Sequence, residues 1–330
     1  MKLSTFAVPI GSAAGQEQVG VIAAGRVHPF PAELSMRDVI ERGLDAAREL
    51  ADAALAGDGF PLDTVRLCTP LRPASVRDFV AFEEHVQGVR RAIEGTAGVP
   101  DAWYDAPTFY FTNPHAILGP GETVRFPSAC SLRDLELEVA VVVGEPGHSL
   151  TVEQARDHVF GYTIMNDWSA RDLQGREMQV GLGPAKGKDF ATTFGPWIVT
   201  ADELEHYRDD DGFLALWCAV SVNGHEIGRD LLSNMSWTFE AMIAYASRDS
   251  RVEAGDVLGS GTVGNGGCLS ELWGHRGEQD PPPLAPGDVV TLTVDGIGSL
   301  TSTVGAAEPT PTLPGARLRD PTLARMAGSL

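Results

Sequence analysis

Short apolar segments separated by turns dominate the chain and predict many β-strands. Over residues 1–34 the apolar positions come in brief bursts that predict a small antiparallel sheet. From about Phe109 onward the pattern recurs in TFYFTN, LELEVAVVV, GYTIMND, GPWIVT, FLALWCAVSVNG, DVLGSGTVG and DVVTLTVDGIGSLTSTV. Frequent glycine (37) and proline (22) suit such short strands and turns. We therefore expect a mainly β protein with some α-helix.

Helical periodicity interrupts this pattern in four places. Ser35 precedes apolar residues at three- and four-residue spacing, which predicts a capped helix over 36–55. The segment SVRDFVAFEEHVQGVRRAIE, residues 75–94, predicts a second helix whose first residues have the spacing of a capping box. We expect a short helix over 152–158, after a capping threonine, and a longer one around 237–247.

The pattern divides the chain into three parts. Residues 1–70 predict a small β-rich N-terminal module, which ends in a Pro-rich link. Residues 71–305 hold most of the predicted strands and form the main domain. Residues 306–330 are Pro-rich and lack periodicity, so we expect a loose tail or a surface arm.

The chain is strongly acidic, which argues against nucleic acid and anionic membranes as partners. It has 330 residues with 45 acidic and 25 basic side chains, a formal net charge of −20. Solubility explains most of this charge, and such a chain repels nucleic acid and anionic membranes. No apolar run reaches the roughly 18 residues of a membrane span. The N-terminal segment MKLSTFAVPIG lacks the apolar stretch of a signal peptide, so we expect a cytoplasmic protein.

The cysteines also point to a reducing compartment. They lie far apart and form no CxxC pair: Cys68, Cys130, Cys218 and Cys268. We expect four reduced thiols rather than disulfides.

Two glutamates stand two residues apart at the start of a predicted buried strand. Glu136 and Glu138 belong to the segment LELEVAVVVG, and residues i and i+2 of a strand share one face. An edge strand with one wet face would explain them about as well as a functional site. However, the strand continues as AVVVG, and two buried carboxylates side by side need a neutralising cation. A hard divalent cation is the simplest such partner.

The segment IMNDWSARDLQ offers a further carboxylate and two donors. Asp167 follows the apolar strand GYTIM, where a simple turn aspartate is the alternative. Arg171 and Gln174 are three residues apart and share a face if a short helix begins here. Two donors on one face, beside a candidate ligand, would suit an oxyanion or a carboxylate substrate.

The remaining candidates are weaker when each is taken alone. Asp78 and His85, seven residues apart, would share a face of the predicted helix, although a helix cap and a partly buried histidine are the favoured explanations when each is taken alone. Lys188 lies in a Gly-rich loop that is more often a solvated turn than a site. Glu271 has apolar neighbours, and a buried glutamate close to a histidine would form a base and its orienting partner.

Taken together and in this order, these segments resemble the fumarylacetoacetate hydrolase family. The matching stretches are RDFVAFEEH, APTFYF, LELEVAVVVG, NDWSARDLQ, GKDFATTFGPW, GSGTVG, SELWG and PGDVVTLTVDGIGSL. They span roughly residues 70 to 304. The resemblance implies a mixed β-roll catalytic domain behind the small N-terminal module, usually as a homodimer.

The resemblance also implies a divalent cation, Mg²⁺ or Ca²⁺, with Mn²⁺ possible. Its implied ligands are four carboxylates, with a threonine lining the metal site: Asp78, Glu136, Glu138, Asp167 and Thr192. The implied general base is His85, oriented by Glu271. Implied donors to the oxyanion and the leaving group are Arg171, Gln174 and Lys188, and implied substrate contacts are Tyr110 and Thr262.

The implied reaction is hydrolysis of a carbon–carbon bond in a ketonic substrate, a small anionic 1,3-diketo acid such as fumarylacetoacetate. A role in aromatic amino-acid degradation would fit this reaction. The chain departs from the animal enzymes at Val80, where they carry a tyrosine, and this puts the exact substrate in question. Alternatives within the superfamily are acylpyruvate hydrolysis, or decarboxylation, isomerisation or hydration of 2-oxo acids. A metal-binding protein without turnover is a further alternative.

Overall fold

Two buried strands form the centre of the fold. The computed structural model describes residues 1–9 and 15–319, and every residue of β11 (Leu137–Val143) and β13 (Val159–Asp167) is buried. The apolar, β-branched sequence of β11 suits a strand that is covered on both faces. The two strands pair antiparallel, and β13 pairs in turn with β15 (Thr192–Thr200).

These strands belong to a larger sheet of twelve strands within the described residues. Its order is β4-β3-β2-β1-β15-β13-β11-β19-β6-β7, with β5 beside β1 and β8 beside β15. Its other members are β1 (Lys2–Ala7), β2 (Glu17–Ala23), β3 (Arg26–Pro29), β4 (Phe60–Pro61), β5 (Arg66–Leu67), β6 (Val76–Phe79), β7 (Phe109–Thr112), β8 (Ile117–Leu118) and β19 (Val257–Gly259).

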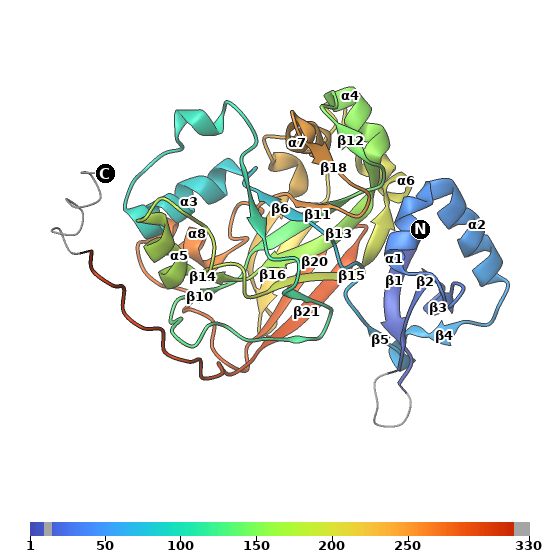
Figure 1. Cartoon of the computed structure of the whole chain (residues 1–330), viewed down its shortest axis with the longest axis horizontal. Coiled ribbons are helices and arrows are strands. Elements are labelled where there is room, and N and C mark those ends of the chain that lie inside the picture. Colours follow the sequence, from blue (N-terminus) through green and yellow to red (C-terminus); the bar gives the residue numbers. More distant parts are fainter. Residues whose placement is uncertain (10–14, 320–330) are drawn as a thin grey trace, which may run out of the picture.

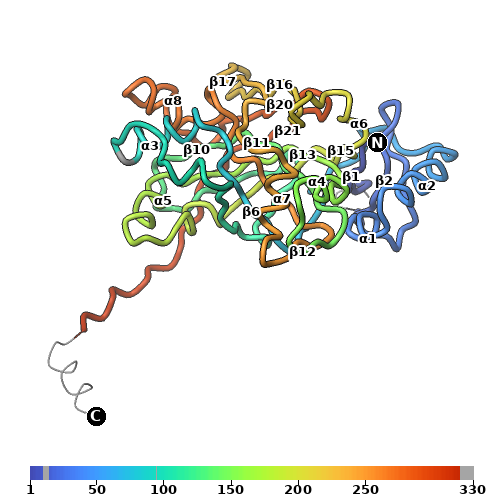
Figure 2. Tube along the Cα trace, turned by 90° about the horizontal axis from the view of Figure 1, so that it is seen from above, coloured from blue at the N-terminus to red at the C-terminus, as the bar shows by residue number. Residues whose placement is uncertain are grey.

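A second sheet covers one face of this centre. It has the order β17-β16-β20-β21-β9, and Figure 2 shows four of these strands along one side of the body. Its members are β9 (Thr123–Val124), β16 (Trp217–Val222), β17 (His225–Leu231), β20 (Val289–Val294) and β21 (Gly298–Val304). Leu137, Val139 and Val141 of β11 share a core with apolar residues of this sheet. Two short pairs complete the strands: β10 (Arg133–Asp134) with β14 (Ser169–Ala170), and β12 (Gly147–His148) with β18 (Arg251–Val252).

The N-terminal segment covers part of the opposite face. Ala140 and Val142 of β11 belong to a second core that includes Leu3 of β1 and Ile40 of α1 (Met36–Glu41). The predicted antiparallel pairing of the first strands is confirmed, and β1 also continues the large sheet by pairing with β15. Figure 1 shows these elements at one end of the body. The face of β11 that carries Ala140 and Val142 is therefore covered by the N-terminal segment.

Helices flank the two sheets. The predicted helix over 36–55 is present but is divided at Arg42 into α1 and α2 (Gly43–Leu55). The predicted cap at Ser35 is confirmed, and the structure shows that it forms a capping box with Asp38. The remaining helices are α3 (Glu83–Glu94), α4 (Val152–Ala155), α5 (Arg171–Met178), α6 (Ala201–Leu204), α7 (Phe239–Ser247) and α8 (Leu269–Arg276). Short 3₁₀ turns occupy Leu62–Thr64, Asp101–Trp103, Arg156–His158, Glu205–Tyr207 and Leu232–Asn234. The helices predicted over 152–158 and 237–247 correspond to α4 with its 3₁₀ extension and to α7.

The predicted helix over 75–94 is wrong in its first half. Residues Val76–Phe79 form strand β6, which lies between β19 and β7, and α3 begins only at Glu83. All four residues of β6 are buried, so two neighbouring strands satisfy its backbone and outweigh the local helical pattern. Asp78 and His85 therefore do not share a helix face, and Ser75 does not cap a helix at this point.

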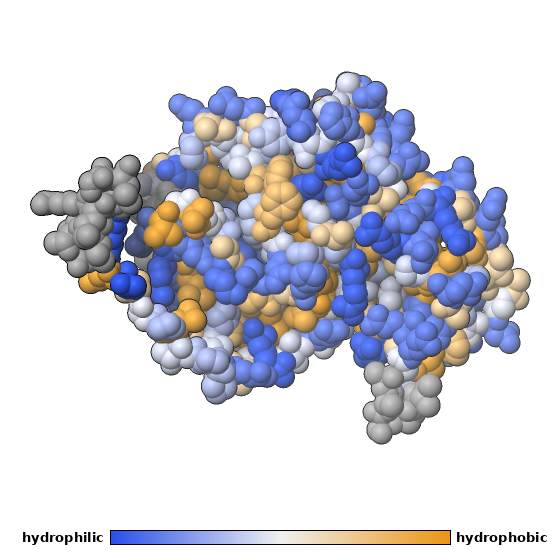
Figure 3. All heavy atoms as spheres, viewed as in Figure 1, coloured by the Kyte–Doolittle hydropathy of each residue, from blue (hydrophilic) through white to orange (hydrophobic). Residues whose placement is uncertain are grey.

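The surface and the termini complete the description. The face seen in Figure 3 is largely hydrophilic, with apolar side chains between the polar ones. Among the described residues, no helix combines the length and apolar content needed to cross a membrane. All four cysteines are buried free thiols, as predicted. Residues 306–319 contain no helix or strand, and the rest of the predicted tail, 320–330, lies outside the described residues. The domain boundaries near residues 70 and 305 stay predictions.

Candidate active site

Four carboxylates meet at one end of the central strands. Asp78 lies in β6, Glu138 at the start of β11 and Asp167 at the end of β13, and Glu136 directly precedes β11. One oxygen of each carboxylate lies within 4.8 Å of those of the others, and all four side chains are buried. Strand pairing explains the meeting, because β11 pairs with both β13 and β19, and β19 pairs with β6. The sequence-based expectation that Glu136 and Glu138 point to one place agrees with this geometry.

The cluster contains oxygens that no protein donor satisfies. Asp78 Oδ1, Glu138 Oε1 and Asp167 Oδ1 are buried and have no hydrogen-bond partner. Thr192, the register partner of Asp167 on β15, also has a buried hydroxyl without a partner. Unpaired buried carboxylate oxygens are costly unless a cation balances them, and hard divalent ions prefer such oxygens. The residues present therefore fit a divalent metal ion.

The pKa values of the cluster also indicate a shortage of positive charge. Burial raises the pKa of Asp78 and of Glu138 well above the ordinary value, and neighbouring carboxylates raise both further. Burial likewise raises the pKa of Asp167. Protein groups alone therefore do not keep all of these carboxylates ionised, whereas a bound cation would favour their charged forms.

Lys188 supplies one positive charge directly. Its buried ammonium contacts the carboxylates of Glu136 and Asp167. Burial opposes the charge, but the carboxylates of Asp167 and Glu136 outweigh it and raise the pKa of Lys188 above its ordinary value. Tyr110 of β7 adds a donor, since its hydroxyl lies 2.6 Å from Asp167 Oδ2. The Gly-rich loop that holds Lys188 thus reaches into the site, whereas Lys186 is exposed and pairs with Asp189.

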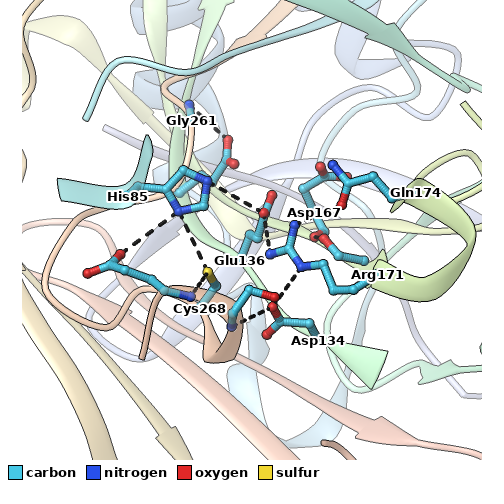
Figure 4. Close-up of polar contacts among 12 residues, drawn as sticks. His85, Asp134, Glu136, Asp167, Arg171, Gln174, Gly261 and Cys268 are labelled. Carbon is cyan, nitrogen blue, oxygen red and sulfur yellow. Dashed lines mark hydrogen bonds and ion pairs between the residues drawn. The ribbon is translucent and has the colours of Figure 1, made fainter. Parts of the chain in front are cut away.

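Arg171 lies at the first position of α5 and connects several groups of the site. Its Nη2 donates to Glu136 Oε1 at 2.6 Å, and its Nη1 donates to Gln174 Oε1 at 3.1 Å. The predicted helix start and the shared face of Arg171 and Gln174 are thus confirmed. The guanidinium Nε donates to Asp134 Oδ2 at 2.8 Å, as Figure 4 shows. Sequence reasoning missed Asp134, although it stands two residues before Glu136 in the same alternating pattern.

His85 and Glu271 meet although they come from different helices. His85 lies in the first turn of α3, and its Nδ1 is 3.9 Å from Glu271 Oε2 on α8. Its Nε2 faces the carboxylate cluster, 3.8 Å from Glu136 Oε1 (Figure 4). Burial lowers the pKa of His85 to about 4 and raises the pKa of Glu271 to about 8. At neutral pH the imidazole is therefore uncharged and can accept a proton.

The two helices can approach closely because glycines face each other. A Cβ on Gly88 of α3 would lie 2.5 Å from Glu271 Cγ, and a Cβ on Gly274 of α8 would meet the Gly88 carbonyl oxygen. Replacing either hydrogen with a side chain would therefore push the helices apart. The pair His85–Glu271 depends on this contact between α3 and α8.

A pocket of about 320 Å³ opens onto these groups. Nine of the twelve predicted site residues line it: Asp78, His85, Tyr110, Glu136, Glu138, Arg171, Gln174, Lys188 and Thr262. The other three stand behind this lining, with Asp167 in the carboxylate cluster, Glu271 behind His85, and Thr192 beside Asp167. The buried Thr262 hydroxyl has no hydrogen-bond partner. The remaining wall is mostly apolar and is formed by Phe79, Val80, Val86, Val89, Phe109, Met178 and Pro184, with Arg90 and Thr108.

Comparisons with known proteins agree with this arrangement. The family model of the fumarylacetoacetate (FAA) hydrolase C-terminal domain matches residues 74–305. The chain is 28% identical over 246 residues to fumarylacetoacetase of Dictyostelium discoideum, a match that covers 61% of this chain and 57% of that enzyme. It is 29% identical over 266 residues to oxaloacetate tautomerase YisK of Bacillus subtilis (strain 168), covering 78% and 81% of the two chains.

A solved structure extends the likeness over nearly the whole chain. A probable 2-hydroxyhepta-2,4-diene-1,7-dioate isomerase from Mycobacterium abscessus superposes with a TM-score of 0.70 at 27% identity, covering 94% of this chain and 100% of that one. These three relatives carry three different reaction names. The family model spans every strand that contributes a carboxylate to the cluster. Because the family model matches residues 74–305, the chain belongs to the fumarylacetoacetate hydrolase family of enzymes.

Proposed function

We propose that this protein is a metal-dependent hydrolase that cleaves a carbon–carbon bond of a small anionic 1,3-diketo acid. One observation carries the proposal: a four-carboxylate cluster and a His–Glu pair lie together at a single pocket, which Asp78, Glu136, Glu138 and His85 line. A metal-binding protein without turnover would need the first feature but not the second.

The metal would be held by Asp78, Glu136, Glu138 and Asp167, with Thr192 nearby. The oxygen-only donor set favours Mg²⁺ or Ca²⁺, and Mn²⁺ is also compatible with it. A divalent ion at this position would act as a Lewis acid that polarises the substrate carbonyl. Lys188 and Arg171 add the positive charge that lets an anionic substrate approach this acidic cluster.

His85 would be the general base of the reaction. Its uncharged imidazole takes a proton from water, and the hydroxide oxygen forms a bond to a carbonyl carbon of the substrate. Glu271, next to Nδ1, orients the ring so that Nε2 faces the pocket. A base of this kind contributes roughly 10²–10⁴ in rate.

The donors of the site would stabilise the negative charge that develops next. Arg171, Gln174 and Lys188 line the pocket and can donate to the tetrahedral oxyanion. The carbon–carbon bond then breaks, and its electron pair stays on the leaving carbon as an enolate. That carbon takes up one proton, from Lys188 or from water. One water is consumed, and the products are a carboxylate and a ketone-bearing acid.

The outer wall of the pocket favours a second candidate substrate. Val80, Val86, Val89 and Met178 give this end of the pocket an apolar lining. Arg90 is at the same end, and its Nη1 donates to the Gly98 carbonyl oxygen at 2.7 Å. An acylpyruvate with an uncharged tail would bury its tail against this wall, at about 0.8 kcal/mol for each buried methylene. Hydrolysis of such acylpyruvates is therefore the second candidate.

An ultraviolet assay tests both candidates. Metal-stripped protein is mixed with fumarylacetoacetate or with an acylpyruvate, with and without Mg²⁺, Mn²⁺ or Ca²⁺, and loss of the enol absorbance is followed. Metal-dependent formation of the two acid products supports hydrolysis, and the preferred substrate decides between the candidates. Keto–enol exchange of oxaloacetate without cleavage of either substrate would overturn the proposal in favour of a tautomerase.

A variant pair separates an enzyme from a metal-binding protein. His85→Ala should abolish cleavage while metal binding and thermal stability remain. His148→Ala, at an exposed position on β12, is the matched control and should keep full activity. A homodimer stays a prediction of the family resemblance, and size-exclusion chromatography with light scattering would test it. A cytoplasmic location stays a prediction from the N-terminal segment and the separate cysteines.

A further inference from the structure

We propose that Asp134 is a positioning residue that holds Arg171 and the start of α8 in a fixed relation to each other. The inference rests on the proposed function, because it concerns the groups that would serve in that reaction. Asp134 ends the short strand β10 and its side chain is completely buried. It lies outside the carboxylate cluster that fits a metal.

Four donors converge on this one carboxylate. Oδ1 accepts hydrogen bonds from the backbone N–H groups of Leu135, at 2.8 Å, and Leu269, at 2.7 Å. Oδ2 accepts from the backbone N–H of Ser270, at 3.0 Å, and from Arg171 Nε, at 2.8 Å. Each oxygen thus bridges one donor at the start of α8 and one donor from another part of the chain.

These contacts connect the two halves of the proposed machinery. Leu269 and Ser270 are the first residues of α8, and Glu271 follows them directly. Arg171, on the other side, donates through Nη2 to Glu136. The Asp134 carboxylate thereby connects Glu271, the partner of the general base, to Arg171, the donor that would stabilise the oxyanion. The negative charge of Asp134 also complements both the guanidinium and the N-terminus of α8.

Asparagine cannot replace this carboxylate, although it has the same shape. An amide has one acceptor oxygen and one NH₂ group, and both Oδ positions here face two donors each. In either orientation the NH₂ group would point at two N–H donors. In both orientations the negative charge that holds the guanidinium is lost, so Asp134→Asn should loosen Arg171 and also disturb the start of α8.

A double-mutant cycle with Arg171→Met tests the proposal on the full chain. Each single variant should lower kcat by roughly 10²–10³, the typical effect of losing one oxyanion donor. Because Asp134 acts in part through Arg171, the loss of kcat in the double variant should be at least about tenfold smaller than the product of the two single losses. Effects that multiply, so that kcat falls by the product of the two factors, would overturn the proposal. So would a kcat for Asp134→Asn equal to that of the unchanged protein.

Asp256 provides a matched structural control. It is also buried, it pairs with Arg77 at 3.0 Å, and it accepts a hydrogen bond from Glu253 N–H at 3.1 Å, but it lies outside the pocket. Asp256→Asn should lower thermal stability. In a double variant with Arg171→Met, the loss of kcat should equal the product of the two single losses to within about threefold. If Asp256 and Arg171 were coupled as strongly as Asp134 and Arg171, the effect of Asp134 would be a general structural one. That result would overturn the proposal.

A readout without catalysis separates this inference from the proposed function. In ¹⁵N spectra the Nε–H signal of Arg171, assigned by its loss in Arg171→Lys, should exchange slowly with solvent in the unchanged protein. In Asp134→Asn the signal should exchange at least about tenfold faster, and an unchanged rate would overturn the proposal even if no substrate is cleaved. If Asp134→Asn does not fold, Asp134→Glu keeps the charge, displaces the carboxylate by one methylene, and should show the same faster exchange.

Discussion

Gly88 on α3 faces Glu271 on α8 so closely that a Cβ at position 88 would lie 2.5 Å from Glu271 Cγ. This contact places the glutamate behind His85, whose Nδ1 is 3.9 Å from it. The absence of a side chain at position 88 is thus a condition for the His–Glu pair.

We predict that Gly88→Ala lowers both stability and activity. The added methyl group has no space, and overpacking of this kind costs about 1–3 kcal/mol. Urea unfolding and steady-state kinetics of the same sample measure the two effects. Gly57→Ala is the control, because its Cβ would meet nothing closer than 3.5 Å. Wild-type kinetics for Gly88→Ala would contradict the dependence of Glu271 on this contact.

A second glycine leaves room for the carboxylate cluster. A Cβ on Gly259 of β19 would lie 2.6 Å from Asp78 Oδ1 and 2.7 Å from Glu138 Oε2. Gly259→Ala should therefore displace two proposed ligands and weaken Mn²⁺ binding at least about tenfold, the effect typical of disturbing a metal-site environment. Isothermal titration calorimetry measures this affinity. Gly175→Ala, whose Cβ would touch only Ile93 Cγ2 at 3.7 Å, should bind Mn²⁺ normally.

Metal binding should also stabilise the fold. A ligand that binds only the folded protein stabilises it by about 2.7 kcal/mol at a hundred times its Kd, which a thermal scan with and without Mg²⁺ detects. Glu138→Gln should remove most of this gain and should raise the Tm of the metal-free protein, because a glutamine is neutral without the cost of burying or protonating a carboxylate in the cluster. Glu33→Gln, at an exposed position, should change neither value. A metal-free Tm below that of the unchanged protein would argue against charge repulsion in the cluster.

The pKa of Glu271 predicts how stability depends on pH. Burial raises this pKa to about 8 from an ordinary value of 4.5, so the folded state binds more protons than the unfolded state between these two values. Its contribution to the free energy of unfolding is therefore fully present below about pH 4.5 and is lost as the pH rises toward about 8. Each pKa unit corresponds to about 1.4 kcal/mol, so the loss amounts to a few kcal/mol.

Glu271→Gln isolates this contribution. Urea unfolding of metal-free protein at pH 5 and pH 8 should show a smaller decrease for the variant than for the unchanged protein. The lowered pKa of His85 acts in the opposite direction between about pH 4 and 6.5, and it is present in both proteins. The difference between the two proteins therefore reports Glu271. An equal decrease in the free energy of unfolding for both proteins between pH 5 and pH 8 would mean that the glutamate ionises normally in the folded state.

The apolar outer wall of the pocket predicts a preference among acylpyruvates. Wild-type protein should hydrolyse hexanoylpyruvate with a higher kcat/KM than acetylpyruvate, since four more methylenes meet Val86 and Val89. Val89→Asp should reverse this order, because a charge would then face the tail. Val152→Asp on α4, at an exposed position away from the pocket, should leave the order unchanged. A preference for fumarylpyruvate over both substrates would contradict the assignment of an uncharged tail.

The large sheet shows why some local predictions failed. The segment 75–94 has helical spacing throughout, yet Val76–Phe79 joins β19 and β7 in the sheet. Strand pairing with residues far away in the sequence decided its conformation, and no local pattern contains that information. Helix α8, which carries Glu271, was likewise not predicted, since a Gly-rich stretch precedes it.

Local periodicity by itself determined a part of the site. The two-residue spacing of Glu136 and Glu138, at the extended start of β11, directs them to one side, and the three-residue spacing of Arg171 and Gln174 places them on one face of α5. Both relations follow from the repeat of a single element, so they need no other part of the chain. Local context also marked Asp167, Lys188 and Glu271 as candidates, and the family resemblance then implied their roles without geometry.

Only the tertiary structure decided how these groups meet. Asp78 reaches the glutamates through the order of strands in the sheet, and His85 reaches Glu271 through the contact of α3 with α8. Asp134 has the same spacing as the glutamates, but its partners at the start of α8 are more than a hundred residues away in the sequence. Such contacts depend on the packing of elements against one another, whereas a sequence pattern reports only the neighbours within one element.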